Sequence, residues 1–338
     1  MTSSISITAR LKHGARRLLQ GVVVAGIAAG ASTAPAHAQN QTQSQAAETP
    51  RELRIGYQKY GTLVLLKARG TLEKRLAEKG VSVKWTEFPF GPPLLEAINV
   101  GSLDVGTVGE APPIFAQAAG ADLVYVGNEP PAPAAEALIV PKDSPIRRVA
   151  ELKGKKIAVA KGSNANYLLI KLLEQAGLKF SDVSVVYLAP ADARAAFEGG
   201  RIDAWSIWDP FLAATEKQLG ARVLADGKGA VANHQFYLAA RAYAEKHPEI
   251  VHILIDEIAQ VDQWGKQNPK EVARFIAPLI GVDLPIAELA AQRLAYGVKP
   301  VTGEVLAQQQ KVADAFTELK LVPRQVRVAD AAWKNGTK

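Results

Sequence analysis

Cysteine is absent from this sequence of 338 residues. Its absence excludes disulfides, thiol nucleophiles, cysteine-ligated metals and the lipid anchor of bacterial lipoproteins, which is attached to a cysteine. Histidine is scarce too, since only His234, His247 and His252 remain after residue 38. The sequence also lacks an HExxH motif, a nucleophile elbow and a Walker loop. We therefore expect a protein that is not an enzyme, with no catalytic residue, cofactor or metal site.

The net positive charge comes mainly from the first residues of the chain. The formal charge is +7, but four basic side chains and no acid lie within residues 1–38, so the remainder carries +3. These four are Arg10, Lys12, Arg16 and Arg17. The remainder contains no Lys/Arg cluster with interleaved aromatic residues, so the sequence gives no reason to expect nucleic-acid binding.

The N-terminal segment has the pattern of a secretory signal peptide. An apolar stretch from Leu18 to Ala34 follows the basic residues, and Ala36-His37-Ala38 places small residues at the cleavage positions. The stretch is too short and too rich in Gly and Ala to favour a membrane anchor. We predict a signal peptide over 1–38, cleaved after Ala38, and a disordered lead-in over 39–50. The mature protein should be periplasmic in a Gram-negative cell and not embedded in the membrane.

Short predicted strands and helices alternate along the chain after residue 50. Strands are expected at Leu53–Tyr57 and Val81–Phe88, with a helix over Thr62–Lys79 between them. The region from Tyr243 to Glu318 is almost wholly helical in period, and we expect it to pack back on the first domain. Such alternation predicts an α/β protein with mostly parallel sheets, and the length suggests about two domains.

One design occurs twice, 99 residues apart. Gly101–Pro112 reads GSLDVGTVGEAP and Gly200–Pro210 reads GRIDAWSIWDP. Each copy has a helix-ending Gly, an Asp three residues later, a short apolar run, and then an acid just before Pro. The acids are Glu110 and Asp209. The pattern predicts two similar α/β halves that bring these corners to opposite walls of one cleft.

Several strand ends lead directly into helix starts, where N–H groups and the helix dipole favour an anion. The clearest is Gly162-Ser163-Asn164, and similar corners occur at 58–61, 109–110 and 208–209. A helix cap without a ligand would explain the same residues. The two acids could likewise cap helices or flank a scissile bond, as in glycosidases. Period two places Trp205 and Trp208 on opposite faces of a strand, so at least one should be core.

Five segments resemble the aliphatic sulfonate-binding proteins of bacterial ABC importers. They are RIGYQKYGTLVLLKARGTLEKRL, FPFGPPLLEAINVGSLDVGTVGEAPPIFAQAAG, VYVGNEPPAPAAEALIV, VAKGSNANYLL and LAPADARAAFEGGRIDAWSIWDPF. The resemblance implies a two-lobed periplasmic binding-protein fold (type II), with the ligand in a cleft between the lobes. It places lobe 1 at 51–138 and 237–338 and lobe 2 at 139–236. The implied partners are an organosulfonate and an ABC permease with its ATPase, and the protein is expected to be a monomer.

The resemblance also implies a set of ligand-binding residues: Gln58, Gly109, Glu110, Asn128, Ser163, Asn164, Trp205 and Asp209. Amides and backbone N–H groups would hold the sulfonate, which offers acceptors only, and an indole would meet the tail. The two acids should orient donors or cap helices rather than touch sulfonate oxygens. The same fold also serves taurine, nitrate and pyrimidine precursors of thiamine, and a secreted enzyme on this fold is a further alternative.

Overall fold

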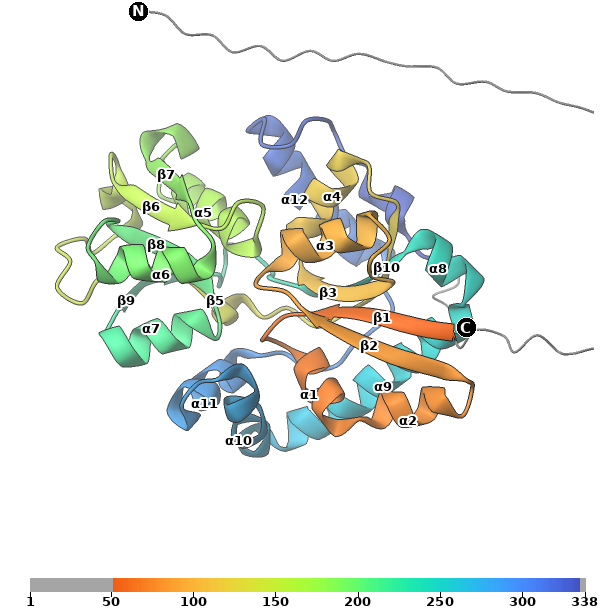
Figure 1. Cartoon of the computed structure of the whole chain (residues 1–338). Coiled ribbons are helices and arrows are strands. Elements are labelled where there is room, and N and C mark those ends of the chain that lie inside the picture. The colour runs from red at the N-terminus through yellow and green to blue at the C-terminus, as the bar shows by residue number, and fades with distance from the viewer. Residues whose placement is uncertain (1–50, 335–338) are drawn as a thin grey trace, which may run out of the picture. The chain divides into compact units, whose positions relative to one another are not determined.

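The computed structural model describes residues 51–334, so the predicted signal peptide and lead-in lie outside the described residues. Within this range the strands form two separate sheets of five strands (Figure 1). We call the part of the chain built on the first sheet lobe 1 and the part built on the second sheet lobe 2. No helix of residues 51–334 combines the length and the apolar character needed to cross a membrane.

The two sheets have the same strand order and the same mixture of directions. In lobe 1 the order is β2 (Val81–Glu87), β1 (Arg51–Tyr57), β3 (Val105–Gly109), β10 (Gln235–Ala240) and β4 (Leu123–Asn128). In lobe 2 it is β7 (Ser184–Tyr187), β6 (Lys156–Val159), β8 (Ala204–Trp208), β5 (Glu136–Val140) and β9 (Arg222–Asp226). The fourth strand of each sheet is antiparallel to both neighbours, and it lies beyond a crossing from the other lobe.

The predicted duplication is confirmed at the level of single residues. Both bounds of α6 (Pro190–Glu198) and of β8 lie 99 residues after those of α3 (Gly91–Asn99) and of β3. In lobe 1 the Asp104 carboxylate accepts the Arg54 backbone N–H at 2.8 Å, and in lobe 2 Asp203 accepts that of Lys156 at 2.8 Å. The repeated Asp therefore fastens the third strand of each half to its first strand.

The other helices cover these sheets. They are α1 (Thr62–Arg69), α2 (Thr71–Ala77), α4 (Pro112–Ala119), α5 (Asn164–Gln175), α7 (Phe211–Leu219), α8 (Arg241–Lys246), α9 (Pro248–Gln267), α10 (Pro269–Ile280), α11 (Leu284–Arg293) and α12 (Gly303–Glu318). Short 3₁₀ turns lie at Pro133–Ala135, Val149–Leu152, Phe180–Asp182 and Val328–Ala331. The predicted single helix over Thr62–Lys79 is wrong. Gly70 adopts φ 63° and ends α1, because glycine takes this left-handed conformation without a steric penalty.

Two crossing segments, 129–135 and 227–234, join the lobes and lie side by side. Ala132 N–H donates to Ala232 O at 3.1 Å, and Glu129 N–H donates to Gln235 O at 2.8 Å. The Asn233 amide nitrogen donates to Ala132 O at 2.9 Å. Asn233 has φ 53°, a conformation that Asn tolerates better than most residues. The crossings thus form a paired hinge whose geometry positions Asn233 and the start of β10.

The C-terminal helices divide between the lobes. As expected, α9 and α12 pack on the sheet of lobe 1, with Val251 and Phe316 in its two apolar clusters. In contrast, α11 packs on α7 of lobe 2 through Ala213, Ala214 and Ile286. The small side chains of this contact allow the two helices to approach closely. The helical region therefore does not pack on lobe 1 alone, as the sequence had suggested, but also adds a third connection between the lobes.

Candidate ligand-binding site

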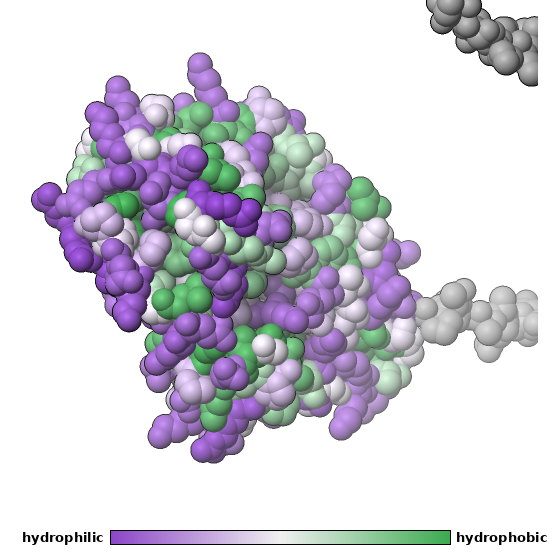
Figure 2. All heavy atoms as spheres, turned by 60° about the vertical axis from the view of Figure 1, so that its left-hand side comes forward, coloured by the Kyte–Doolittle hydropathy of each residue, from purple (hydrophilic) through white to green (hydrophobic). Residues whose placement is uncertain are grey.

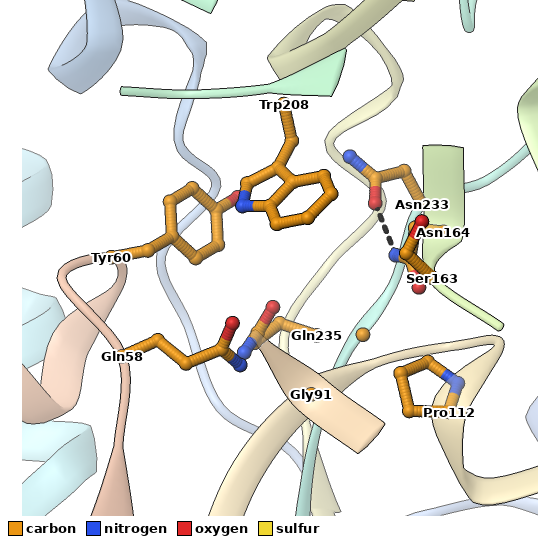
Figure 3. A pocket seen from close by; sticks show the side chains of 10 residues that line it. Gln58, Tyr60, Gly91, Pro112, Ser163, Asn164, Trp208, Asn233 and Gln235 are labelled. Carbon is orange, nitrogen blue, oxygen red and sulfur yellow. Dashed lines mark hydrogen bonds between the residues drawn. The ribbon is translucent and has the colours of Figure 1, made fainter. Parts of the chain in front are cut away.

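A cavity lies between the lobes at the carboxyl ends of strands from both sheets (Figure 3). It encloses about 400 Å³ of empty space, including the part open to solvent. We call it the inner chamber, and its lining residues are Gln58, Tyr60, Gly91, Gly109, Pro112, Ser163, Asn164, Trp208, Asn233 and Gln235. None of these ten side chains carries a charge at neutral pH. Several polar groups line this small cavity, so it suits a compact polar group of a ligand.

Three helices begin at the inner chamber, but they offer very different numbers of N–H groups. Both α3 and α4 have Pro-Pro at their starts, at 92–93 and 112–113, so two N–H groups are missing from each first turn. In α5, Gly162 with φ 71° leads into the N-cap Ser163, and the helix begins with Asn164 and Ala165. The N–H groups of a first turn have no partner within the helix, so α5 is the helix that can donate to an anion.

The Ser163 hydroxyl is occupied within its own turn. It accepts the Asn166 N–H at 3.3 Å and donates to Ala160 O at 2.7 Å. Ser163 is therefore both a cap of α5 and part of the chamber wall. The two interpretations left open by the sequence, helix cap and ligand site, do not exclude each other.

Asn164 connects the lobes across the inner chamber. Its Oδ1 accepts the Ala111 N–H of lobe 1 at 3.0 Å, and its Nδ2 donates to Asn233 Oδ1 at 2.5 Å, the bond drawn in Figure 3. Gly109 makes this contact possible, because a Cβ at that position would lie only 2.1 Å from Asn164 Nδ2. The contact between the lobes therefore requires a residue without a side chain at position 109.

Two glutamine amides enter the chamber from the lobe 1 side. Gln58 Nε2 donates to Thr107 O at 3.1 Å, and Gln235 Nε2 donates to Thr107 Oγ1 at 2.7 Å. An amide nitrogen carries two hydrogens, so each Gln keeps one donor for a ligand while Thr107 fixes its orientation. Trp208 and Tyr60 form the opposite wall, as Figure 3 shows. Burial raises the pKa of Tyr60, so its hydroxyl remains a donor.

The predicted acids lie behind the wall of the inner chamber. Glu110 is 2% exposed, and one of its oxygens accepts the His234 N–H at 3.1 Å while the other has no partner among the described residues. Burial raises the pKa of Glu110 to about 7, against the lowering effect of that N–H. Asp209 is fully buried and accepts the Ala213 N–H of α7 at 2.9 Å. Both acids hold backbone groups rather than facing the chamber.

Two further predicted residues also lie outside the lining. Trp205 is fully buried with Ile207 in the core of lobe 2, and it is Trp208 that reaches the chamber. This confirms the alternation of the two indoles. Asn128 is 5% exposed, and its amide nitrogen donates to Glu129 O at 3.0 Å at the start of a crossing. Of the eight predicted residues, the chamber brings together Gln58, Gly109, Ser163 and Asn164.

The other lining residues besides Trp208 were not among the predicted site residues; they are Tyr60, Gly91, Pro112, Asn233 and Gln235. Tyr60 lies inside the corner 58–61, which was identified only as a corner. Asn233 and Gln235 flank the return crossing, where an Asn directly before a strand is a weak signal. Among residues 51–334, no group of three His, Asp or Glu side chains could hold a metal ion.

Comparison with known proteins assigns the family. Residues 76–272, more than half of the chain, match the family model described as NMT1/THI5 like. The chain belongs to the NMT1/THI5-like family. A relative from Escherichia coli K12, named as binding aliphatic sulfonates, is 48% identical over 86% of this NMT1/THI5-like chain and 91% of its own.

Two solved structures have the same fold as this NMT1/THI5-like chain. One is an alkanesulfonate-binding protein of Xanthomonas axonopodis pv. citri bound to MOPS, with a TM-score of 0.81 and 43% identity over 85% of this chain and 99% of its own. The other is a periplasmic aliphatic sulphonate binding protein of E. coli, with a TM-score of 0.77 and 47% identity over 85% and 93%. The predicted two-lobed binding-protein fold is thereby confirmed.

Proposed function

We propose that this protein binds aliphatic sulfonates in the periplasm and delivers them to an ABC permease with its ATPase. The observation that carries the proposal is the inner chamber, which is rich in neutral donors and has no charged side chain in its lining. The names of the two solved neighbours and of the E. coli relative support the same ligand class. Because these relatives are named as binding proteins, we infer capture and release rather than turnover.

The chemistry of the ligand fits the donors. A sulfonate is ionised at physiological pH and accepts hydrogen bonds without donating any, so N–H groups and amides suit its three oxygens. We assign the head group to the start of α5 together with Gln58, Asn164 and Gln235, and the tail to Trp208 in place of Trp205. Glu110, Asn128 and Asp209 support the walls. Their place behind the lining supports the expectation that acids do not touch the sulfonate.

Lobe closure is the proposed mechanism. A ligand held by lobe 2 gains the contacts of lobe 1 only when the lobes meet, so binding shifts a hinge equilibrium. We place the lobe boundaries in the crossings 129–135 and 227–234, since 138/139 and 236/237 fall within β5 and β10. Cleavage after Ala38 belongs to the same proposal and lies outside the described residues. The protein would act as a soluble monomer.

Titration calorimetry with a ligand panel tests the proposal. Methanesulfonate, ethanesulfonate, taurine, sulfate and nitrate would each be added to the purified mature chain. We expect heat and saturation with the alkanesulfonates. Binding of nitrate or sulfate without any sulfonate would overturn the assignment in favour of an alternative ligand. Mass spectrometry of the bound sulfonate after incubation separates capture from turnover.

Gly109→Ala should weaken sulfonate binding by about tenfold, or about 1.4 kcal/mol. The new Cβ displaces the Asn164 amide and removes its bond to Ala111 N–H, which closes the chamber. Stability should change little, because the three atoms nearest to this Cβ all belong to the amide end of the Asn164 side chain, which can turn away. Gly303→Ala is the matched control, since its Cβ would meet nothing within 4 Å. If Gly109→Ala binds sulfonates with unchanged affinity, the Asn164 contact does not contribute to binding.

A further inference from the structure

Two carboxyl groups are buried against each other in lobe 1. Hydrophilic side chains cover much of the face that Figure 2 shows, whereas Glu129 is only 4% exposed and Asp262 only 1% exposed. Glu129 begins the crossing 129–135, and Asp262 lies on α9. The two side chains form a hydrogen bond with each other. We call Glu129 and Asp262 the acid pair.

All three connections between the lobes meet at Glu129. Its backbone N–H donates to Gln235 O at 2.8 Å, directly after the return crossing. Its Oε2 accepts the Gly297 N–H at 2.9 Å, and Gly297 lies in the segment 294–302, which leads from α11 to α12. Its Oε1 accepts the Tyr237 hydroxyl of β10 at 2.6 Å. Glu129 therefore joins its own crossing to the return crossing and to the helical connection.

Asp262 binds the same junction to the helices of lobe 1. Its Oδ1 accepts the Thr62 hydroxyl at the start of α1 at 2.6 Å, and its Oδ2 accepts the Val298 N–H at 2.8 Å. Gly297 and Val298 are neighbours in the chain, so two successive N–H groups of the segment 294–302 each bind one acid. Each of the four oxygens of the acid pair thus already accepts one hydrogen bond from a surrounding segment.

The acid pair is stable with one proton between its two carboxyl groups. Two buried carboxylates in contact repel each other, and one shared proton removes this repulsion. The ion pairs among residues 51–334 include neither acid, so no salt bridge offsets a second negative charge. Burial, together with the charge of Asp262, raises the pKa of Glu129 to about 9, and burial also raises the pKa of Asp262.

Three tyrosines and a histidine are the other titratable groups around the acid pair. The charges of both acids act on Tyr237 and Tyr296, and the charge of Glu129 acts on Tyr60. Burial raises the pKa of each tyrosine above its ordinary value of 10.0, so these hydroxyls keep their protons when the acid pair loses its own. The His234 ring meets the backbone of Glu129, since its Nδ1 lies 2.9 Å from the carbonyl oxygen.

We propose that Glu129 and Asp262 are positioning residues for ligand binding, which share one proton and hold the three connections in the arrangement that closes the inner chamber. The inference rests on the proposed function, because ligand affinity is one of its readouts. Neither acid lines the inner chamber, but Tyr60 and Gln235 line both that chamber and a small pocket that Glu129 also lines. Loss of the shared proton places two negative charges at the junction, and their repulsion separates the connections.

The pH dependence of affinity tests the shared proton. The dissociation constant for ethanesulfonate should rise by about tenfold from pH 8 to pH 10, because the open form releases the proton at a lower pH than the ligand-bound form. Asp262→Asn should abolish this rise, since its amide donates to Glu129 without a titrating proton. Asp256→Asn, at an exposed position on the same helix, is the matched control and should keep the wild-type profile. Parallel profiles for wild type and Asp262→Asn would overturn the proposal.

Variants at Glu129 separate positioning from packing, with circular dichroism to check the fold. Glu129→Gln should keep the affinity at pH 8 within about threefold, whereas Glu129→Leu should lower it by about tenfold or more, because the Gly297 N–H and the Tyr237 hydroxyl lose their acceptors. Equal affinities for the two variants would refute the positioning role.

Infrared spectroscopy detects the shared proton without a ligand. A protonated carboxyl absorbs apart from a carboxylate, and this band should be weaker in Glu129→Gln than in the wild type at pH 8. An unchanged band would refute the shared proton. If ethanesulfonate and every other sulfonate fail to bind the wild type, the proposed function is refuted instead.

Discussion

Arg293→Met is expected to lower the free energy of unfolding by about 3 kcal/mol at pH 8 and by much less at pH 5. Arg293 lies on α11 and reaches into lobe 2, where its Nη1 is 3.4 Å from Asp209 Oδ1 and its Nη2 is 2.7 Å from Glu216 Oε2. Asp209 is fully buried, so the loss of its cationic partner leaves an unpaired charge in the interior. Methionine keeps the packing of the arginine stem and removes only the charge.

The pH dependence of this effect has a definite sign. Burial raises the pKa of Asp209 to about 6, although Arg293 acts to lower it. Without Arg293 the pKa in the folded protein rises further. A carboxyl whose pKa is higher in the folded protein than in the unfolded chain adds to the free energy of unfolding at low pH. That contribution is lost as the pH rises through the pKa of the folded protein. The destabilisation by Arg293→Met should therefore grow above pH 6.

Urea denaturation at pH 5 and pH 8 measures the effect, and two further variants control it. Adding Asp209→Asn to Arg293→Met should restore most of the loss at pH 8, because a neutral amide needs no counterion. Arg274→Met removes an exposed partner of Glu271 and should cost less than about 0.5 kcal/mol. Equal destabilisation at the two pH values would show that Arg293 acts through packing instead of charge.

Glu110→Gln should raise the free energy of unfolding at pH 8 by up to about 3 kcal/mol and change it little at pH 5. The pKa of the buried Glu110 rises to about 7 from an ordinary value of 4.5, and burial is the main cause. The folded protein therefore holds a proton that the unfolded chain has released between these values. Stability falls over this interval as the pH rises, and the neutral amide removes the dependence while it still accepts the His234 N–H.

The measurement is urea denaturation of both proteins at several values between pH 5 and pH 8. Glu78→Gln, at an exposed position on the far end of α2, is the control and should leave the pH profile unchanged. A profile of Glu110→Gln that runs parallel to that of the wild type would contradict the raised pKa. A loss of stability at all pH values would point to a structural need for the carboxylate.

The duplicated sheets could be predicted because their signals are local. A helix-ending Gly and an Asp that binds a neighbouring strand lie within a few residues of each other, so each copy carries its own evidence. The same holds for the start of α5, where Gly162 and Ser163 form the turn. Four of the eight residues that the family resemblance implied, Gln58, Gly109, Ser163 and Asn164, lie at such corners and line the chamber. The local pattern is enough wherever one turn determines where a side chain points.

The remaining lining residues depend on how distant segments meet. Asn233 and Gln235 reach the chamber because the two crossings pair with each other, and no periodicity in the sequence encodes that pairing. Alternation separated Trp205 from Trp208, but the packing of α6 and α7 decides which side is core. The contact of α11 with α7 relies on alanines, which give no clear apolar stripe. These are effects of tertiary packing, which secondary-structure propensity does not predict.

The Pro-Pro starts of α3 and α4 imply an order of events in ligand capture. Lobe 1 offers few N–H groups at the chamber, whereas the first turn of α5 in lobe 2 contains no proline and keeps its N–H groups, one of which Ser163 caps. An anion should therefore be held first by lobe 2, and lobe 1 should add its amides afterwards. Changes at α5 would then act on the association rate constant, and changes at Gln58 or Gln235 on the dissociation rate constant. Lobe 2 would thus determine how fast the anion binds, and lobe 1 how fast it leaves.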